Sequence, residues 1–167
     1  MRLGDMPYRR GQHALIAFAL WFASVASFAI DNPDAPDLTA QFQSRAQPFE
    51  ARIGDAAGSV GKTVAAYADY ERFLNSELTQ SYAALQRQLN LAERAALTQS
   101  QARWLAYRDA EFRFIDRNWN VSRFGTSATL SRNGYRSAVT KERTMTLLLY
   151  LKNYGSVATG EQSSANR

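Results

Sequence analysis

The chain has 167 residues and a formal net charge of +5, and it contains no cysteine and one histidine, His13. These counts exclude thiol chemistry, and beyond the N-terminal segment they also exclude Ser-His-Asp catalysis and the usual zinc ligands. We therefore expect a protein that is not an enzyme and that binds no cofactor or metal. The basic residues are scattered rather than gathered in runs, so no nucleic-acid partner is predicted.

Residues 1–29 have the order of a secretory signal peptide: a positively charged start, an apolar run over 14–26, and small residues at Ser27 and Ala29. The apolar run is shorter than the ~20 residues that a membrane-spanning helix needs. We therefore predict cleavage after Ala29 and export to the periplasm, with no membrane span left in the mature chain. Cleavage removes three arginines and one aspartate, which leaves 138 residues with a net charge of +3.

Residues 30–59 are predicted to form a linker and a short amphipathic segment. The linker is polar and contains two prolines, and Asp37 at its end is a possible N-cap. Apolar residues then recur at near-helical spacing from Leu38 to Ile53, but Pro48 argues against one uninterrupted helix. The small residues of 54–61 indicate a loop.

Two long helices are predicted in the middle of the chain. In the first, from about Val60 to Leu89, leucines and a tyrosine recur every three or four residues in one stripe, as a bundle helix requires. The second follows a short break at Asn90, where Asn90 and Glu93 have the spacing of a capping box. Because the break is short, we expect the two helices to be antiparallel neighbours. The predicted inner face of the second helix comprises Leu97, Gln101, Trp104, Arg108, Phe112, Ile115 and Trp119.

A third long helix is predicted after a loop from Asn118 to Thr126 that lacks periodicity. Ser127 is a possible N-cap for this helix, which is expected to run to about Asn153 and to end at Gly155 as its C-cap. Its predicted inward face comprises Tyr135, Val139, Thr146, Leu149 and Tyr150.

The predicted fold class is all-α. Residues 60–155 would form a small bundle of about three long antiparallel helices, preceded by the extra short N-terminal helical segment. The remaining residues, 156–167, are rich in glycine, serine and alanine and are predicted to be a disordered tail.

Two patterns suggest enzymatic chemistry at first sight but are better explained structurally. Residues 56–63 nearly match a phosphate-binding loop, yet no strand precedes them, so we interpret them as a loop that leads into a helix. Asp109, Glu111 and Asp116 cluster on one helix, but the first two diverge and are expected to pair with arginines rather than to act as paired catalytic carboxylates.

Three motifs together resemble the N-terminal domain of the LprI-type lysozyme inhibitors, a small helical domain of bacterial secreted and envelope proteins. The motifs are Leu74-Asn75-x-x-Leu78-x-x-x-Tyr82-x-x-Leu85, Gln101-x-x-Trp104-x-x-Tyr107-Arg108-Asp109-Ala110-Glu111 and Thr140-x-Glu142-Arg143-Thr144. The resemblance covers a little under half of the chain. It implies a helical domain exported to the periplasm and, for some members, inhibition of lysozyme.

The chain departs from the family pattern at two positions where relatives commonly carry cysteine, here Phe112 and Tyr135. We expect an aromatic contact between these two residues to replace the disulfide that the resemblance implies. Such a contact contributes ~0.5–1.5 kcal/mol beyond its area burial, against ~2–4 kcal/mol for a typical disulfide.

Four motif residues are interpreted as structural bracing between helices rather than as ligand contacts. In this interpretation the arginines bury their stems and pair with carboxylates such as Glu111 or Glu142. The four residues are Trp104, Arg108, Thr140 and Arg143.

The best candidate for a partner-binding surface is the loop between the second and third helices, because aromatic and arginine side chains are the usual interface anchors. Its candidate residues are Arg117, Trp119, Arg123, Phe124 and Ser127. The predicted function is inhibition of lysozyme or a related peptidoglycan hydrolase, with Arg123 as salt-bridge donor to a carboxylate-lined cleft and Trp119 or Phe124 as anchor. Two alternatives stay open: the aromatic residues only close the end of the bundle, or the protein is an envelope binding or assembly module that uses residues 38–53 or an exposed helix face.

Overall fold

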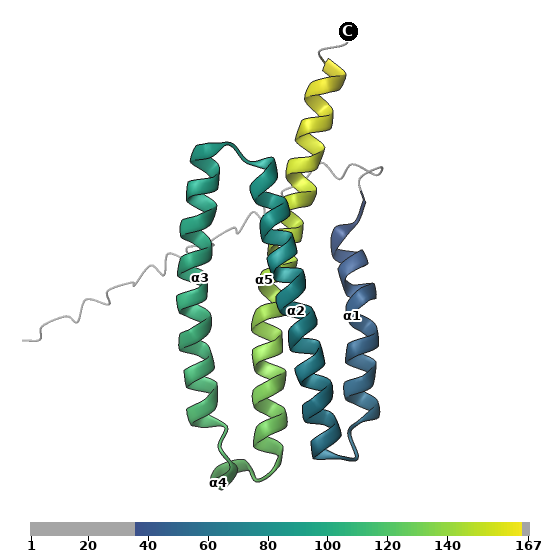
Figure 1. Ribbon diagram of the computed structural model, residues 1–167, viewed down its shortest axis with the longest axis vertical. Helices are drawn as coiled ribbons and strands as arrows, with labels where there is room; N and C mark the ends of the chain where they lie inside the picture. Colours follow the sequence, from purple (N-terminus) through teal and green to yellow (C-terminus); the bar gives the residue numbers. More distant parts are fainter. Residues whose placement is uncertain (1–35, 165–167) are drawn as a thin grey trace, which may run out of the picture. The chain divides into compact units, whose positions relative to one another are not determined.

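The computed structural model describes the backbone of residues 36–164 and the side chains of residues 36–154. The predicted signal peptide, residues 1–29, lies outside the described residues. Within them the chain forms five α-helices and no strand, which confirms the predicted all-α bundle (Figure 1). The helices are α1 (Leu38–Asp55), α2 (Val60–Gln88), α3 (Leu91–Asn118), the short α4 (Val121–Phe124) and α5 (Ser127–Ser164).

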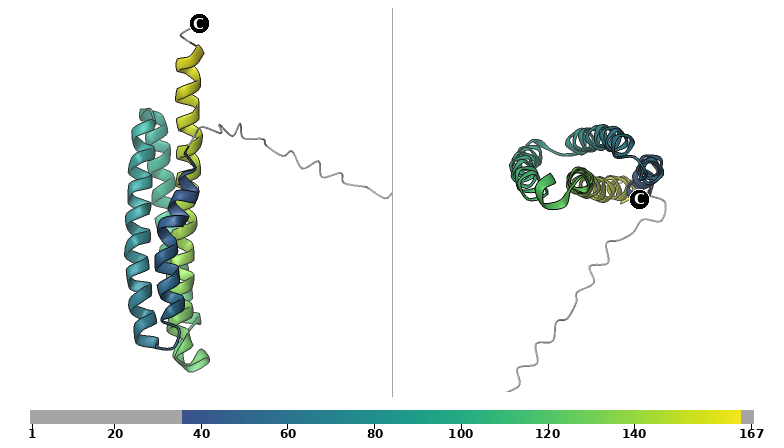
Figure 2. Two further views of the ribbon diagram at one scale, coloured as in Figure 1. Left: turned by 90° about the vertical axis from the view of Figure 1, so that its right-hand side faces the viewer. Right: turned by 90° about the horizontal axis from the view of Figure 1, so that it is seen from below.

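The four long helices alternate in direction along the chain because each connection between them is short. As a consequence α2 and α5 run parallel to each other, and this pair forms the most extensive packing of the bundle. The end-on view in Figure 2 places α1 and α3 on opposite sides of the α2–α5 pair. α2 and α3 run antiparallel, as the break at Asn90 predicted, but they are not the close neighbours expected, since α3 packs mainly against α5.

Side-chain caps fix where the helices begin. Asp37 caps α1, since its Oδ1 accepts hydrogen bonds from the backbone N–H groups of Thr39 at 3.0 Å and Ala40 at 2.9 Å. Asn90 and Glu93 form the predicted capping box at the start of α3. Ser127 was predicted to be the N-cap of α5, but it is the first residue of that helix. Its hydroxyl donates to the carbonyl of Phe124 at 2.6 Å.

The N-terminal segment is a single 18-residue helix, α1, rather than the short broken segment predicted from Pro48. Pro48 is exposed, so the carbonyl that loses its helical partner lies on the solvent side, where water can satisfy it. The opposite face of α1 buries Phe42 and Ala46 completely. Burial of a phenylalanine side chain contributes roughly 1.5–3 kcal/mol, which offsets the missing hydrogen bond.

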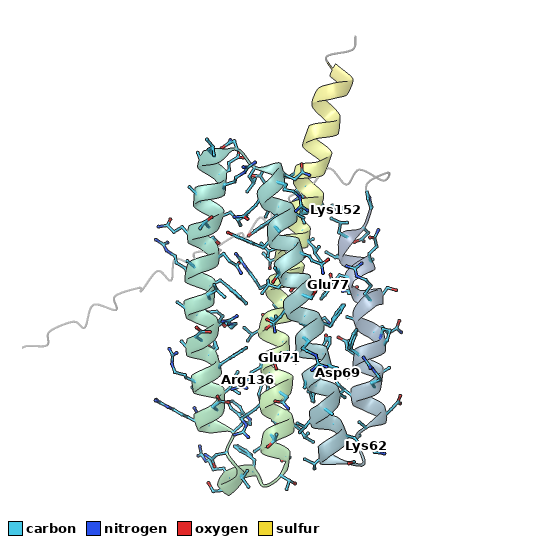
Figure 3. All side chains as sticks on the ribbon, viewed as in Figure 1. Lys62, Asp69, Glu71, Glu77, Arg136 and Lys152 are labelled. Atoms are coloured by element: carbon cyan, nitrogen blue, oxygen red, sulfur yellow. The ribbon has the colours of Figure 1, made fainter. Side chains whose placement is uncertain are left out.

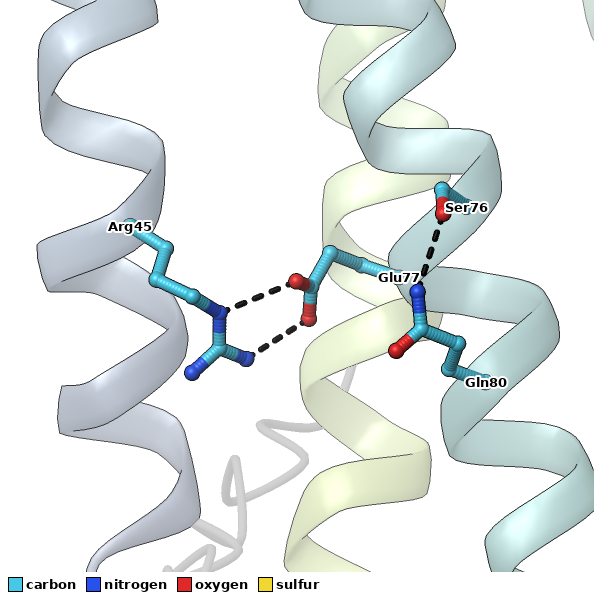
Figure 4. Close-up of polar contacts among 4 residues, drawn as sticks. All are labelled: Arg45, Ser76, Glu77 and Gln80. Carbon is cyan, nitrogen blue, oxygen red and sulfur yellow. Dashed lines mark hydrogen bonds and ion pairs between the residues drawn. The ribbon is translucent and has the colours of Figure 1, made fainter.

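The α1–α2 contact also contains a bidentate ion pair. Glu77 is 8% exposed and points from α2 towards α1 (Figure 3). Its carboxylate accepts hydrogen bonds from Nε of Arg45 at 3.0 Å and from Nη2 at 2.7 Å (Figure 4). The pair fixes the position of α1 along α2, because a forked guanidinium accepts only one relative placement of the two oxygens.

The apolar core consists of two clusters on opposite sides of the α2–α5 pair. Where α1 packs, the buried residues are Phe42, Ala46, Tyr70, Leu74 and Leu148. Where α3 begins, they are Leu78, Leu85, Leu89, Leu97 and Leu147.

The buried face of α5 differs from the prediction. Tyr135, Leu149 and Tyr150 are exposed, whereas residues with smaller side chains such as Thr140 and Thr144 are buried. The hydroxyls of both threonines donate to backbone carbonyls four residues earlier, so they are buried without an unsatisfied donor. A face of serine and threonine lets neighbouring helices approach α5 closely, and an apolar spacing pattern alone does not reveal it.

The end of α5 also differs from the prediction. The helix continues to Ser164 instead of ending near Asn153 with Gly155 as its C-cap. A glycine inside a helix costs about 1 kcal/mol relative to alanine, and no proline follows it to stop the helix.

Candidate functional site

A ladder of arginine and aromatic side chains joins α3 to the neighbouring part of α5. The guanidinium carbon of Arg143 lies 5.9 Å from the centre of the Trp104 ring. Arg108 lies 5.6 Å from the same ring and 5.8 Å from the ring of Phe112, and Arg136 lies 5.2 Å from Phe112. Each cation–π contact contributes about 0.5–1 kcal/mol at exposed sites and about 2 kcal/mol where water is excluded. Figure 3 shows Arg136 between the two helices.

The ladder arginines are only partly paired with carboxylates. Arg108 forms an ion pair with Asp109 at 2.8 Å, and Arg136 forms one with Asp116 across the helix interface. The Nε atom of Arg136 is buried without a hydrogen-bond partner. Arg136 and Arg143 reach from α5 to aromatic rings of α3, and Arg136 also reaches Asp116, so these contacts hold the two helices at one register.

Arg143 does not have the carboxylate partner that the sequence suggested, and Glu111 does not pair with Arg108. Arg143 donates from Nε to the Gln101 side chain at 3.0 Å and from Nη2 to the hydroxyl of Ser100 at 3.3 Å. Burial lowers the pKa of the Arg143 guanidinium from its ordinary value. The difference arises because Gln101 and Ser100 lie opposite Arg143 on α3, while Glu142 is exposed on α5.

Thr140, the fourth residue of the predicted bracing set, is buried in α5. Its hydroxyl donates to the Arg136 carbonyl at 3.3 Å within the same helix. It is therefore not one of the side chains that form the ladder, and it contributes through the close packing of α5.

At the end of the ladder, beside the short helix α4, three aromatic rings gather around Trp119. The ring of Trp119 lies 4.8 Å from that of Tyr135, 5.9 Å from Phe114 and 6.4 Å from Phe124. Trp119 is half-buried, but Phe114, Phe124 and Tyr135 are 54%, 48% and 45% exposed. We call these four residues the aromatic cluster. A monomer seldom leaves so many neighbouring aromatic rings in contact with water unless the patch serves in recognition.

The backbone that carries the aromatic cluster is fixed by local contacts. Asn120 caps α4, with its Oδ1 accepting from the N–H of Arg123 at 3.1 Å. Gly125 ends α4 with φ 61° and ψ −152°, a conformation that is essentially restricted to glycine. The loop therefore presents Trp119 and Phe124 in a defined orientation.

The structure brings the predicted partner-binding residues to the same end of the bundle. Arg117 and Arg123 are exposed, and neither forms an ion pair within the described part of the chain. Ser127 is exposed beside Phe124, to which it is hydrogen-bonded. Phe124 joins three of the five candidates, because its ring stacks near that of Trp119 and its carbonyl accepts from Ser127.

Sequence reasoning missed two members of the aromatic cluster, Phe114 and Tyr135. It expected Tyr135 to contact Phe112, but among the described residues the Tyr135 ring packs on Trp119, and Phe112 packs on Arg108 and Arg136. Phe112 and Tyr135 thus both contribute to the packing between α3 and α5, but through separate contacts. The density of aromatic residues around the loop could have predicted that both residues belong to the cluster; the spacing of the family motif could not.

The other patterns singled out in the sequence have structural roles. The Thr63 hydroxyl lies within hydrogen-bond distance of the carbonyls of Ala56 at 2.7 Å and Ser59 at 2.9 Å, so it closes the turn between α1 and α2. Within the part of the chain that the structure describes, no group of three or more potential metal-ligating side chains was found. In the same part, no helix has the length and apolarity needed to cross a bilayer.

Comparison with known protein families places these features in context. A family model described as lysozyme inhibitor LprI matches residues 54–147, more than half of the chain. The chain belongs to the LprI family. The match confirms the resemblance inferred from the three sequence motifs, and it includes the whole ladder and the aromatic cluster. Nearly all of α1 precedes the region that the LprI family model matches. Searches of curated proteins and of solved structures found no significant match.

Proposed function

We propose that this protein is an exported, non-enzymatic inhibitor of lysozyme or of a related peptidoglycan hydrolase. Membership of the LprI family supports the class of target. The observation that carries the choice of surface is the aromatic cluster, which is exposed at one end of the bundle and flanked by the unpaired Arg117 and Arg123.

The chemistry of this end suits an enzyme cleft that contains carboxylates. Glycoside hydrolases generally use two acidic residues on either side of the bond that they cleave. An exposed guanidinium can form two parallel hydrogen bonds with such a carboxylate, and a neighbouring aromatic ring can exclude water from the contact. In this proposal Arg123 is the salt-bridge donor, and Trp119 or Phe124 is the anchor.

The rigidity of the loop favours inhibition. A loop that is already ordered loses less conformational entropy on binding than a mobile one. The N-cap at Asn120, the glycine conformation at Gly125 and the packing of Trp119 on Tyr135 supply this order without a disulfide.

Export is the second part of the proposal. The order of charged, apolar and small residues in 1–29 supports a signal peptide that is cleaved after Ala29. An inhibitor of peptidoglycan hydrolases would act in the periplasm, where these enzymes reach their substrate.

The proposal is tested by measuring inhibition of lysozyme-catalysed lysis by a Trp119→Ala, Arg123→Ala double variant. We expect the inhibition constant to rise by at least roughly tenfold, since anchor residues of this type contribute about 2 kcal/mol or more each. The matched control is Arg87→Ala with Leu91→Ala, which removes an exposed arginine and an exposed apolar residue at the opposite end of the bundle. Equal inhibition by both variants would exclude this surface.

The alternative function is an envelope binding or assembly module, for which two surfaces were considered. One of them, residues 38–53, is not available as an apolar binding face. The apolar residues of Leu38–Ile53 pack against the core and leave no free apolar face on α1. A binding module would have to use another helix face, such as one of the two sides of α3 on which Leu105 or Tyr107 is exposed. Recovery of a stable periplasmic partner that is not a hydrolase would favour this alternative.

A further inference from the structure

An open groove lies between α1, α2 and α5. One hollow of about 300 Å³ has walls that include Ile53 of α1, Tyr67 of α2 and Ala138 of α5. A second, neighbouring hollow of about 350 Å³ lies between α2 and α5; it shares Tyr67 and Gly134 with the first and is also lined by Tyr135. Each hollow has the volume of a small ligand pocket, for which the usual range begins at about 300 Å³.

A three-residue polar group lines one end of the groove. Oε1 of Glu50 on α1 accepts hydrogen bonds from the hydroxyl of Tyr70 on α2 at 2.6 Å and from Nζ of Lys141 on α5 at 2.7 Å. Tyr70 is buried, whereas the side chains of Glu50 and Lys141 are 43% and 30% exposed. The second carboxylate oxygen of Glu50 and two N–H groups of Lys141 therefore remain able to bond a ligand.

The charge of this group selects the class of ligand. Glu50 and Lys141 neutralise each other, so the groove offers no net attraction to an anion or a cation. A zwitterion would have to separate the existing ion pair before it could bind. A neutral ligand with neighbouring hydroxyl groups can bind while the ion pair stays intact. One hydroxyl donates to the free carboxylate oxygen of Glu50, and the next accepts from the ammonium group of Lys141.

The remaining walls suit the apolar face of a sugar ring. The lining is more apolar than polar, and it includes the rings of Tyr67 and Tyr70 beside Ile53 and Ala138. Sugars present a C–H face and a hydroxyl rim, which match an aromatic or aliphatic wall next to hydrogen-bonding groups. This combination is not expected for a purely apolar ligand, because the Glu50–Lys141 pair would lose its solvation.

Gly134 and Tyr67 line both hollows, which are therefore neighbours. A Cβ atom at position 134 would lie 3.3 Å from the hydroxyl oxygen of Tyr67, which is a tight contact. Two neighbouring hollows suit an oligosaccharide better than a single sugar.

We propose that this groove binds a neutral oligosaccharide, with one sugar on Glu50, Lys141 and Tyr67 and the next towards Tyr135. Glu50 and Ile53 come from the part of α1 that precedes the region matched by the LprI family model. The site would thus combine residues outside the matched region with residues inside it. It is separate from the inhibitory contact proposed above, apart from Tyr135, which borders both.

The proposal is tested by saturation-transfer NMR and calorimetry with the full mature chain and chitotriose or cellotriose as probe. We expect saturable binding that is weakened by at least roughly tenfold in Ala138→Trp, since the exposed Ala138 lines the groove and a tryptophan there fills it. Ala102→Trp on the exposed surface of α3 is the matched control and should bind normally. Glu50→Gln, which keeps the shape of the side chain, should also weaken binding.

Three outcomes would overturn the proposal: no saturable binding of either trisaccharide, equal binding by Ala138→Trp and Ala102→Trp, or binding of an Ala-Ala dipeptide in preference to the sugars. The Trp119→Ala, Arg123→Ala variant distinguishes this site from the inhibitory one. It should lose inhibition and keep sugar binding, whereas loss of sugar binding in that variant would place the sugar on the aromatic cluster instead.

Discussion

At the scale of single residues, the arginines of this protein decide how the helices meet. Arg45 fixes α1 on α2, while Arg136 and Arg143 hold α5 against α3. Arginine suits both tasks, because its planar guanidinium pairs with carboxylates and stacks on aromatic rings. The sequence alone identified Arg108 and Arg143 as bracing candidates but not their partners, since these depend on the register between helices.

Replacement of Arg45 by alanine tests the α1–α2 ion pair. We expect Arg45→Ala to lower the free energy of unfolding by roughly 1–3 kcal/mol, because it leaves the carboxylate of Glu77 buried without its partner. Urea denaturation followed by circular dichroism measures the change. A second variant, Arg45→Met with Glu77→Leu, should recover most of the loss, and a double variant as unstable as Arg45→Ala would contradict this explanation.

The pH dependence of stability tests the contact of Glu50. Hydrogen bonds from Lys141 and then from Tyr70 lower the pKa of the Glu50 carboxyl below its ordinary value of 4.5. A carboxyl with a depressed pKa stabilises the fold above its ordinary pKa, and this stabilisation is lost as the pH falls through the folded-state pKa. The melting temperature of the wild type should therefore exceed that of Glu50→Gln at neutral pH, and the difference should shrink as acid protonates Glu50. A difference that stays constant from about pH 7 to about pH 3 would argue against this role.

At the scale of secondary-structure elements, a long apolar stripe and a capping box predicted helices correctly, whereas a single proline did not predict a break in α1. The stripe that includes Leu74, Leu78 and Leu85 predicted α2, and the Asn90 capping box predicted where α3 begins. Pro48 misled the prediction of α1, because its cost depends on whether the lost hydrogen bond faces solvent. The inward face of α5 was misjudged because α5 contacts all four other helices, and a helix with several neighbours has no single apolar stripe.

The connection between α4 and α5 depends on one glycine. We expect Gly125→Ala to cost about 1–3 kcal/mol, since its backbone conformation is strained for any residue with a Cβ atom. The same substitution should weaken inhibition, because it displaces Phe124 and Trp119. Thermal unfolding and the lysis assay measure the two effects.

Gly58→Ala is the control for this substitution. Gly58 lies in the turn between α1 and α2, has no positive φ, and has open space around its missing Cβ. The change should leave stability unchanged or raise it by about 0.4–1 kcal/mol. If Gly125→Ala behaved like Gly58→Ala, the backbone at Gly125 would not be what orders the loop.

At the scale of the whole molecule, the fold and the family followed from the sequence, whereas the assembled surfaces did not. Helical periodicity and three spaced motifs were enough for an all-α LprI domain. The aromatic cluster joins residues from α3, α4 and α5, and the groove joins residues from α1, α2 and α5. Such surfaces depend on how helices distant in sequence align, so single-helix patterns do not contain them.

The molecule thus has a part that the LprI family model matches, residues 54–147, and a helix, α1, that lies almost entirely before it. The matched part carries the ladder and the aromatic cluster, on which the inhibitor proposal rests. Helix α1 completes one core cluster and one wall of the groove. Separate variants can thus test the two proposed sites within one folded protein.

The most direct test of the inhibitor proposal is a titration of the purified mature chain, from Ile30 onward, into lysis assays of bacterial cell walls with several types of lysozyme. We predict stoichiometric loss of lysis for at least one lysozyme. A folded helical protein that leaves every lysozyme fully active at micromolar concentration would contradict the proposal.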